Sequence, residues 1–260
     1  MTQDDPNGTD RSKPGTGMPL EPLASQVISM LRERQTTGPS GARQIIVDYL
    51  VRAVTTPAGF DAPLVMEEMR AYRLTVDTII DLYIPQAAEH LGEMWVTSDI
   101  DFASVTVGAL RLQALLGEAS AELAHIAHPS HDALHALVVV PEGEQHFLGA
   151  SVVAAQLRRL GCDVSISISE SAKQIAMRAS YDEPDMVLIS CARAAALESV
   201  APTVNKIRSN AARRPVVALG GALRGDADGI KEKTGVDLVT NTAKDVVSFC
   251  MKRRKALSRG

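Results

Sequence analysis

Five short aliphatic segments recur in the second half of this 260-residue chain, and no other feature constrains its fold as strongly. A segment with helical spacing follows each of them. A strand followed by a helix, repeated five times, predicts a parallel sheet with helices on both faces. The predicted strands are residues 134–140, 162–168, 185–190, 215–219 and 236–240, and the predicted helices are residues 146–160, 171–180, 197–209, 226–234 and 243–255.

The polarity of the predicted strands indicates their order. Segments 134–140, 185–190 and 215–219 are aliphatic throughout, as strands covered on both faces are. Segment 164–168 instead alternates between aliphatic residues and serines, which is typical of a strand at the edge of a sheet. We therefore expect a flavodoxin-like (Rossmann-like) order, 2-1-3-4-5, which places a ligand-binding switch point between the first and third strands.

Helical spacing dominates the first half of the chain, where no strand is predicted. Several antiparallel helices joined by short loops are typical of a helical bundle. The expected helices are residues 23–34, 41–54, 61–74, 75–91 with a kink at Pro85, and 102–126. We therefore expect three units, which are a disordered leader at 1–19, a helical bundle cap at 20–128 and an α/β domain at 129–260.

The composition is typical of a globular protein in the cytoplasm. Hydrophobic residues make up 45% of the chain and charged residues 22%. The net charge of -4 gives no reason to expect direct binding to DNA. No apolar run is long enough to span a membrane, and residues 1–17 lack the basic start and apolar stretch of a signal peptide. The three cysteines are far apart, so neither a disulfide nor a zinc site is expected.

A histidine follows the most apolar predicted strand. His146 lies in the loop after this strand, and Glu144 precedes it by two residues. In open α/β sheets, ligands bind just outside the carboxyl ends of the strands. A neutral imidazole binds transition metals, and a carboxylate on its other ring nitrogen strengthens it as a donor. Because the loop offers no other good metal ligand, we expect any metal to arrive inside a cofactor that supplies its remaining ligands.

Two further features come to the same edge of the predicted sheet. Ser190 ends the third strand, and Gly220-Gly221 ends the fourth. The crevice would therefore be lined by an imidazole, a hydroxyl and bare backbone, which a ligand can approach closely. Alternatively, Ser190 caps the next turn, and the two glycines form an ordinary turn between a strand and a helix.

The residues of this crevice resemble a motif of a known family, the cobalamin-binding domain of methionine synthase and the base-off mutases. That motif reads D-x-H-x-x-G, then S-x-L, then G-G, and the matching residues here are Glu144, His146, Gly149, Ser190, Gly220 and Gly221. The resemblance implies that His146 is the lower axial ligand of cobalt and that Glu144 is the partner of its imidazole. It also implies that Ser190 and the two glycines form the pocket for the dimethylbenzimidazole tail. The chain departs from the motif at Glu144, which replaces Asp, and at Ala192, which replaces Leu.

The helical half resembles the cap of cobalamin-based regulators, most closely the AerR/PpaA-type regulators of photosynthesis genes. The resemblance rests on segments 91–95 and 102–108, and it implies that Trp95 lies over the corrin. In the related light-responsive repressors CarH and LitR, the tryptophan is followed after nine residues by Glu-His. Val105-Thr106 stands there in this chain, so we do not expect the adenosyl photochemistry of CarH.

The resemblance implies a regulator and not an enzyme. The expected function is that of a cobalamin-binding photoreceptor or redox sensor, which acts as an antirepressor in transcription regulation. Since no DNA-binding domain is recognisable, it would act through contact with a repressor of the PpsR/CrtJ type. The alternatives are a corrinoid carrier for a methyltransferase, a haem-binding sensor on the same fold, and a flavodoxin-like module without a cofactor.

Two further clusters, one of basic residues and one of histidines, are interpreted as structural rather than as binding sites. The basic run at 252–255 suits a solvated helix end, where positive charge offsets the helix dipole, although contact with DNA or an acidic partner is an alternative. Four histidines between the two halves are interpreted as part of a linker rather than a metal site, because a proline interrupts their helical spacing. They are His125, His128, His131 and His135.

Overall fold

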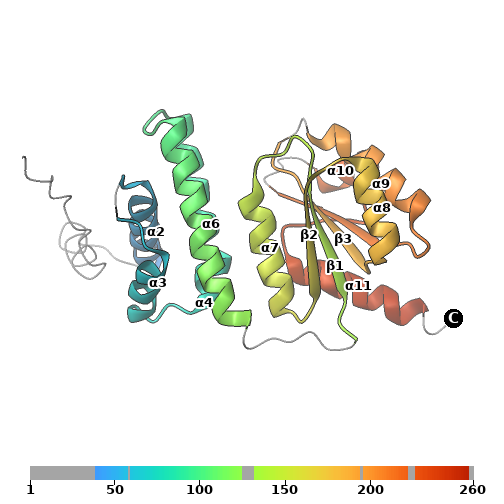
Figure 1. Ribbon diagram of the computed structural model, residues 1–260, viewed down its shortest axis with the longest axis horizontal. Coiled ribbons are helices and arrows are strands. Elements are labelled where there is room, and N and C mark those ends of the chain that lie inside the picture. The colour runs from blue at the N-terminus through green and yellow to red at the C-terminus, as the bar shows by residue number, and fades with distance from the viewer. Residues whose placement is uncertain (1–38, 58, 125–131, 194–195, 222–225, 258–260) are drawn as a thin grey trace, which may run out of the picture.

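The structure is a computed structural model that describes residues 39–57, 59–124, 132–193, 196–221 and 226–257 (Figure 1). The predicted leader at 1–19 and the predicted helix at 23–34 lie outside these residues. None of the described helices has the length and apolar character needed to cross a membrane.

The second half forms the predicted parallel sheet, and the order is β2-β1-β3-β4-β5. The strands are β1 (His135–Pro141), β2 (Asp163–Glu170), β3 (Met186–Ser190), β4 (Val216–Gly220) and β5 (Leu238–Val239). The order predicted from strand polarity is confirmed. Val138 of β1 pairs with Ile166 of β2 on one side and with Leu188 of β3 on the other, so the alternating strand lies at the edge.

Helices cover both faces of the sheet, as the aliphatic strands require. Ala136, Val138 and Val140 of β1 pack with α7 and α11, whereas Leu137 and Val139 pack with α8 and α9. This alternation follows from the two-residue period of a strand. The helices are α7 (Phe147–Arg159), α8 (Ala172–Asp182), α9 (Leu197–Asn210), α10 (Ala227–Thr234) and α11 (Ala243–Leu257).

The first half is a helical bundle with its own buried core. Its helices are α2 (Pro39–Thr55), α3 (Ala62–Ala71), α4 (Val76–Thr78), the π-helix η1 (Ile79–Tyr83), α5 (Ile84–Val96) and α6 (Phe102–Ala124). Two predicted helix starts are confirmed. The side chain of Asp61 accepts a hydrogen bond at the start of α3, and that of Thr75 does so at the start of α4.

The prediction of one kinked helix over 75–91 needs correction. The segment changes from α to π to α, and the last part ends at Val96. Ile84 donates its backbone N–H to the carbonyl of Ile79, five residues back, and Pro85 follows directly. Because proline has no N–H to give to the α-helical pattern, the chain accommodates it at the start of α5, after the wider turn.

Helix α7 connects the bundle to the sheet. One side of it packs on β1, while Val152 and Ala155 on another side belong to the buried core of the bundle. Arg159 forms ion pairs with Asp77 and Asp81, which lie in α4 and η1. The bundle therefore stands beside α7 and not against the strands themselves (Figure 1).

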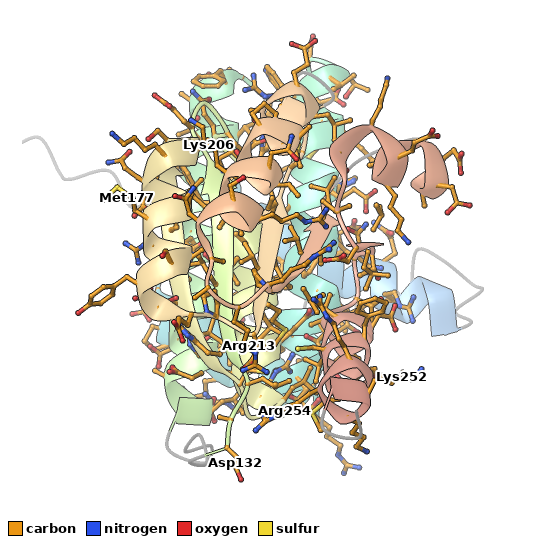
Figure 2. All side chains as sticks on the ribbon, turned by 90° about the vertical axis from the view of Figure 1, so that its right-hand side faces the viewer. Asp132, Met177, Lys206, Arg213, Lys252 and Arg254 are labelled. Carbon is orange, nitrogen blue, oxygen red and sulfur yellow. The ribbon has the colours of Figure 1, made fainter. Side chains whose placement is uncertain are left out.

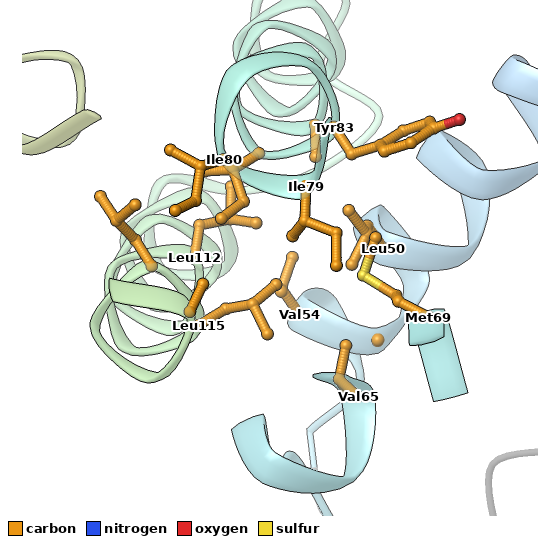
Figure 3. Close-up of a cluster of buried hydrophobic side chains, with 14 of the residues drawn as sticks. Leu50, Val54, Val65, Met69, Ile79, Ile80, Tyr83, Leu112 and Leu115 are labelled. Carbon is orange, nitrogen blue, oxygen red and sulfur yellow. The ribbon is translucent and has the colours of Figure 1, made fainter. Parts of the chain in front are cut away.

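The core of the bundle predicts a clear contrast between two leucines of α6. Leu112 is fully buried beside Ile80 (Figure 3), whereas Leu110 is 66% exposed. Leu112→Ala leaves a cavity, so we expect it to lower the free energy of unfolding by about 2–5 kcal/mol. Leu110→Ala is the matched control and should change it by less than about 1 kcal/mol. Urea denaturation followed by circular dichroism measures both, and equal effects would contradict the assigned core.

Candidate cofactor-binding site

The loop after β1 places His146 at the carboxyl edge of the sheet. The strand ends at Pro141, whose carbonyl accepts the backbone N–H of Glu144 at 3.1 Å. Gly143 supplies the left-handed backbone angle that this turn needs, with φ of +81°. His146 then occupies the position just before the first residue of α7. The imidazole is thus carried by a tight turn between a buried strand and a buried helix.

Glu144 is the most thoroughly hydrogen-bonded side chain of this edge. It is 1% exposed, although it is a carboxylate. Its oxygens accept backbone N–H groups of Gln145 at 2.8 Å, His146 at 3.1 Å and Ala192 at 3.0 Å. Burial alone would raise its pKa, but these bonds and one from the His146 ring favour the ionised form and lower the pKa to about 2.

His146 is held at one ring nitrogen and open at the other. Its Nδ1 lies 2.5 Å from Oε1 of Glu144, and an ionised carboxylate only accepts, so Nδ1 carries the proton. The lone pair is therefore on Nε2. Because 60% of the side chain is exposed, a ligand at the sheet edge can reach this atom. A carboxylate that fixes the tautomer of a metal-binding histidine is a common arrangement in metal sites.

Ser190 and Gly149 face one another beside this pair. A methyl group built on Gly149 would meet the Oγ atom of Ser190 at 4.0 Å, so these two residues of α7 and β3 are close neighbours. Within the described part of the chain, the Ser190 hydroxyl makes no hydrogen bond, and the alternative role of capping the next turn has no support there. The hydroxyl remains available to a ligand.

Gly220 and Gly221 let the ends of neighbouring strands approach closely. Gly221 has φ of +128°, and a Cβ atom there would lie 2.0 Å from the carbonyl oxygen of Cys191. A Cβ atom on Gly220 would lie 2.7 Å from the carbonyl oxygen of Thr240. Close backbone packing at the edge thus requires both glycines, and their part in a tail pocket stays a prediction.

Trp95 lies apart from the other predicted site residues, near the turn between α5 and α6. Its ring centre is 6.3 Å from that of Phe102, and the two side chains are 50% and 67% exposed. The amino end of α6 is at the same end of the molecule as the carboxyl ends of the strands (Figure 1). Two exposed aromatic rings are therefore presented at the end of the bundle where the predicted cofactor would lie.

Three contacts of the site were not predicted. The backbone amide of Ala192 bonds Glu144, so the contact does not depend on which side chain stands there. Arg193 donates to the carbonyl of Gly143 at 2.5 Å and connects the loops after β1 and β3. Asn241 accepts the N–H of Gly221 at 2.7 Å. Only the position of Arg193 and Asn241 after predicted strands could have drawn attention to them.

The histidines between the two halves do not add a second metal centre within the described residues. Of these, His135 lies in β1, where its Nδ1 is 3.1 Å from the carbonyl oxygen of Asp182. His125, His128 and His131 lie outside the described residues. No group of three potential metal-binding side chains occurs among the residues that the structure describes. The donor set at His146 fits a metal that brings its other ligands with it.

Comparisons with known proteins identify the family of this chain. A model of the B12 binding domain matches residues 134–248. An uncharacterized 20.5 kDa protein from the bchF-crtJ intergenic region of Rhodobacter capsulatus is 34% identical over 185 residues, which cover 71% of this chain and 96% of that protein.

One solved structure shows the same fold. The monomethylamine corrinoid protein of Methanosarcina barkeri superposes with a TM-score of 0.66 at 16% identity, over 80% of this chain and 95% of that one. A cobalamin-binding protein from Desulfitobacterium hafniense gives a TM-score of 0.40 at 17% identity, over 79% and 97% of the two chains. The resemblance found in the sequence is confirmed, and the chain belongs to the B12-binding domain family.

Proposed function

We propose that this chain binds cobalamin through His146 and acts as a transcriptional antirepressor that responds to light or redox state. The observation that carries the proposal is the pair formed by a buried Glu144 carboxylate and a His146 ring whose side chain is exposed, within the residues that match the B12 binding domain. The protein would act by contact with a repressor of the PpsR/CrtJ type. The 34% identical relative, named for its place between bchF and crtJ, supports this choice of partner.

Each site residue has a role in holding the cofactor. The Nε2 atom of His146 would donate to cobalt, and Glu144 keeps the proton on Nδ1 so that Nε2 stays a donor. The Ser190 hydroxyl would hydrogen-bond the tail, which Gly149 leaves room to approach. Trp95 of the bundle would cover the corrin. When bound, cobalamin supplies a cobalt centre whose axial ligation and oxidation state can change with light or redox conditions.

The ionisation of Glu144 favours a binding role over a catalytic one. A general acid or base works best when its pKa lies near the working pH. The pKa of Glu144 is about 2, and the carboxylate already accepts four hydrogen bonds. It is therefore suited to orient an imidazole and poorly suited to transfer protons. We accordingly propose that the protein is not an enzyme.

Two other functions use the same site. A corrinoid carrier for a methyltransferase is favoured by the fold shared with the monomethylamine corrinoid protein. The bulky rings of Trp95 and Phe102 oppose it, because methyl exchange needs an open upper face. A haem-binding sensor is the other candidate, since a neutral imidazole with a free Nε2 also binds haem iron.

The role of His146 predicts a change in the absorption spectrum of the bound cofactor. Wild-type protein mixed with hydroxocobalamin should retain it after gel filtration, with the spectrum of nitrogen-ligated cobalt. His146→Ala should lose the cofactor or shift its spectrum, because the donor atom is gone. Gln145→Ala is the control, since that residue contacts Glu144 only through its backbone N–H. Haem, methylcobalamin and adenosylcobalamin are tested in parallel, and an unchanged spectrum in His146→Ala would exclude this histidine as the ligand.

The role of Glu144 predicts a loss of affinity. Glu144→Gln removes the charge that strengthens His146 as a donor, so we expect cobalamin to bind about 10–100-fold more weakly. Because the pKa of Glu144 is about 2, its carboxylate is ionised near neutral pH, where the affinities are compared. Glu142→Gln, an exposed carboxylate of the same loop, should bind as the wild type does. Equal affinities for all three proteins would contradict the role of Glu144.

The proposed function predicts binding to the repressor that depends on the state of the cofactor. Cobalamin-loaded protein should bind an immobilised PpsR/CrtJ-type repressor with an affinity that differs between dark and light, or between oxidised and reduced samples. Cofactor-free protein and His146→Ala should lack that difference. Biolayer interferometry measures all of these affinities. Rapid methyl transfer with a partner methyltransferase, together with no repressor binding, would favour the carrier instead.

A further inference from the structure

Basic side chains gather at the amino edge of the sheet, opposite the edge that holds His146. Two of them precede β4, and three lie in the last turns of α11. Figure 2 shows Arg213 and Arg254 close together on this side, with Lys252 on the adjacent face of α11. We define the α11 basic surface as Arg213, Arg214, Lys252, Arg253 and Arg254.

Part of this cluster has a structural role. Arg253 donates to the carbonyl of Arg214 at 3.2 Å, and Arg254 donates to the carbonyl of Asp132 at 3.4 Å. Both bonds fasten the end of α11 to the segments that lead into the sheet. The carboxyl end of a helix carries a negative partial charge, which also accounts for basic residues in the last turns of α11. Neither reason explains two arginines in the loop before β4.

Arg213 and Arg214 are only loosely paired. Each guanidinium lies 3.5 Å from a carboxylate, Arg213 from Asp185 and Arg214 from Asp237, which is longer than an ordinary hydrogen bond. Asp237 is engaged more closely by Arg208, at 3.2 Å. Both arginine side chains are 57% exposed, and neither makes a hydrogen bond through its guanidinium within the described residues. The exposed guanidinium groups therefore keep donors that can bind another group.

The charge of this surface is opposite to that of the whole chain. The chain carries a net charge of -4, yet five cations gather here beside three carboxylates, those of Asp132, Asp185 and Asp237, and leave an excess of positive charge. Like charges that lie close together repel one another in the free protein. A partner of opposite charge reduces this repulsion, which favours its binding at this surface. Arginine in particular pairs with carboxylates through two parallel hydrogen bonds. The surface therefore fits an anionic partner.

Apolar side chains stand beside the cations on the same helix. Phe249 is 38% exposed and Met251 is 42% exposed. Residues three and four apart are neighbours on a helix surface, so Phe249 lies next to Lys252 and Arg253. Met251 is two residues from Phe249 and therefore lies on another side of α11, next to Arg254. A partner that covers both sides needs apolar groups as well as negative charge. A phosphate backbone offers none, so the exposed Phe249 and Met251 favour a protein partner over a nucleic-acid duplex.

We propose that the α11 basic surface, together with Phe249 and Met251, binds an acidic and partly apolar segment of a protein partner. This inference deepens the proposed function, on which it rests for the kind of partner involved. Because the surface and His146 lie at opposite edges of the sheet, the partner and the cofactor do not compete for space. The protein could therefore hold both at once.

The test measures binding of a defined probe to cobalamin-loaded full-length protein. The probe is a fluorescein-labelled peptide in which glutamate alternates with leucine, and fluorescence anisotropy reports its binding. The comparison probes are a glutamate peptide of equal charge without leucine, and a short DNA duplex. The variants are Arg213→Gln/Arg214→Gln and Lys252→Gln. Lys206→Gln is the matched control for Lys252→Gln, because it removes the same single charge from an exposed position on α9, away from Arg213 (Figure 2).

We expect Lys252→Gln and the double variant each to weaken peptide binding about tenfold, and Lys206→Gln to change it less than about twofold. Met251→Ser should weaken binding of the leucine-containing peptide only, whereas Met177→Ser, an exposed methionine of α8, should not. Circular dichroism confirms that each variant is folded.

Other results would overturn the proposal. These are equal losses in Lys206→Gln, tighter binding of the duplex than of the peptide, and no peptide binding by the wild type. The cobalamin spectrum of each variant should stay that of the wild type. The peptide results can agree with these expectations while the affinity for the repressor does not depend on the cofactor. That combination would contradict the antirepressor function and still support the α11 basic surface as a peptide-binding site.

Discussion

The site depends on the hydrogen bonds that the buried carboxylate of Glu144 accepts. The carboxylate joins three parts of the chain, because it accepts bonds from the loop after β1, from the start of α7 and from the loop after β3. A charge can stay buried only when such bonds replace its hydration. The same bonds that keep Glu144 ionised also aim the His146 ring, so the fold of the edge and the chemistry of the imidazole have one cause.

The two halves of the chain are combined through α7. This helix carries His146 at its start, packs on the sheet along one side and contributes Val152 and Ala155 to the core of the bundle. The bundle is therefore anchored to the element that begins at the imidazole. Trp95 and Phe102 stand at the matching end of the bundle, so packing on α7 relates the predicted lid to the site.

Much of this architecture follows from the sequence, and the exceptions have physical reasons. The alternation in Val164 to Ile168 was enough to place β2 at the edge, but burial along the strand does not follow it, because Ser167 is buried and Ile168 is 51% exposed. The pair Glu144 and His146 was visible because both belong to one short loop. The amide of Ala192 was not visible, because its contact depends on how two separate loops bend toward one another. Pro85 indicated a break in the helix, but not that a π-helical turn would absorb it.

The double packing of α7 has a consequence for how such a protein can change. A residue like Val152 or Ala155 meets the bundle, while Ala150 and Leu157 on the same helix meet the sheet. A substitution that shifts or rotates α7 therefore disturbs the packing of both cores at once. Replacing either half by that of a distant relative would therefore require matching changes on the side of α7 that this half contacts.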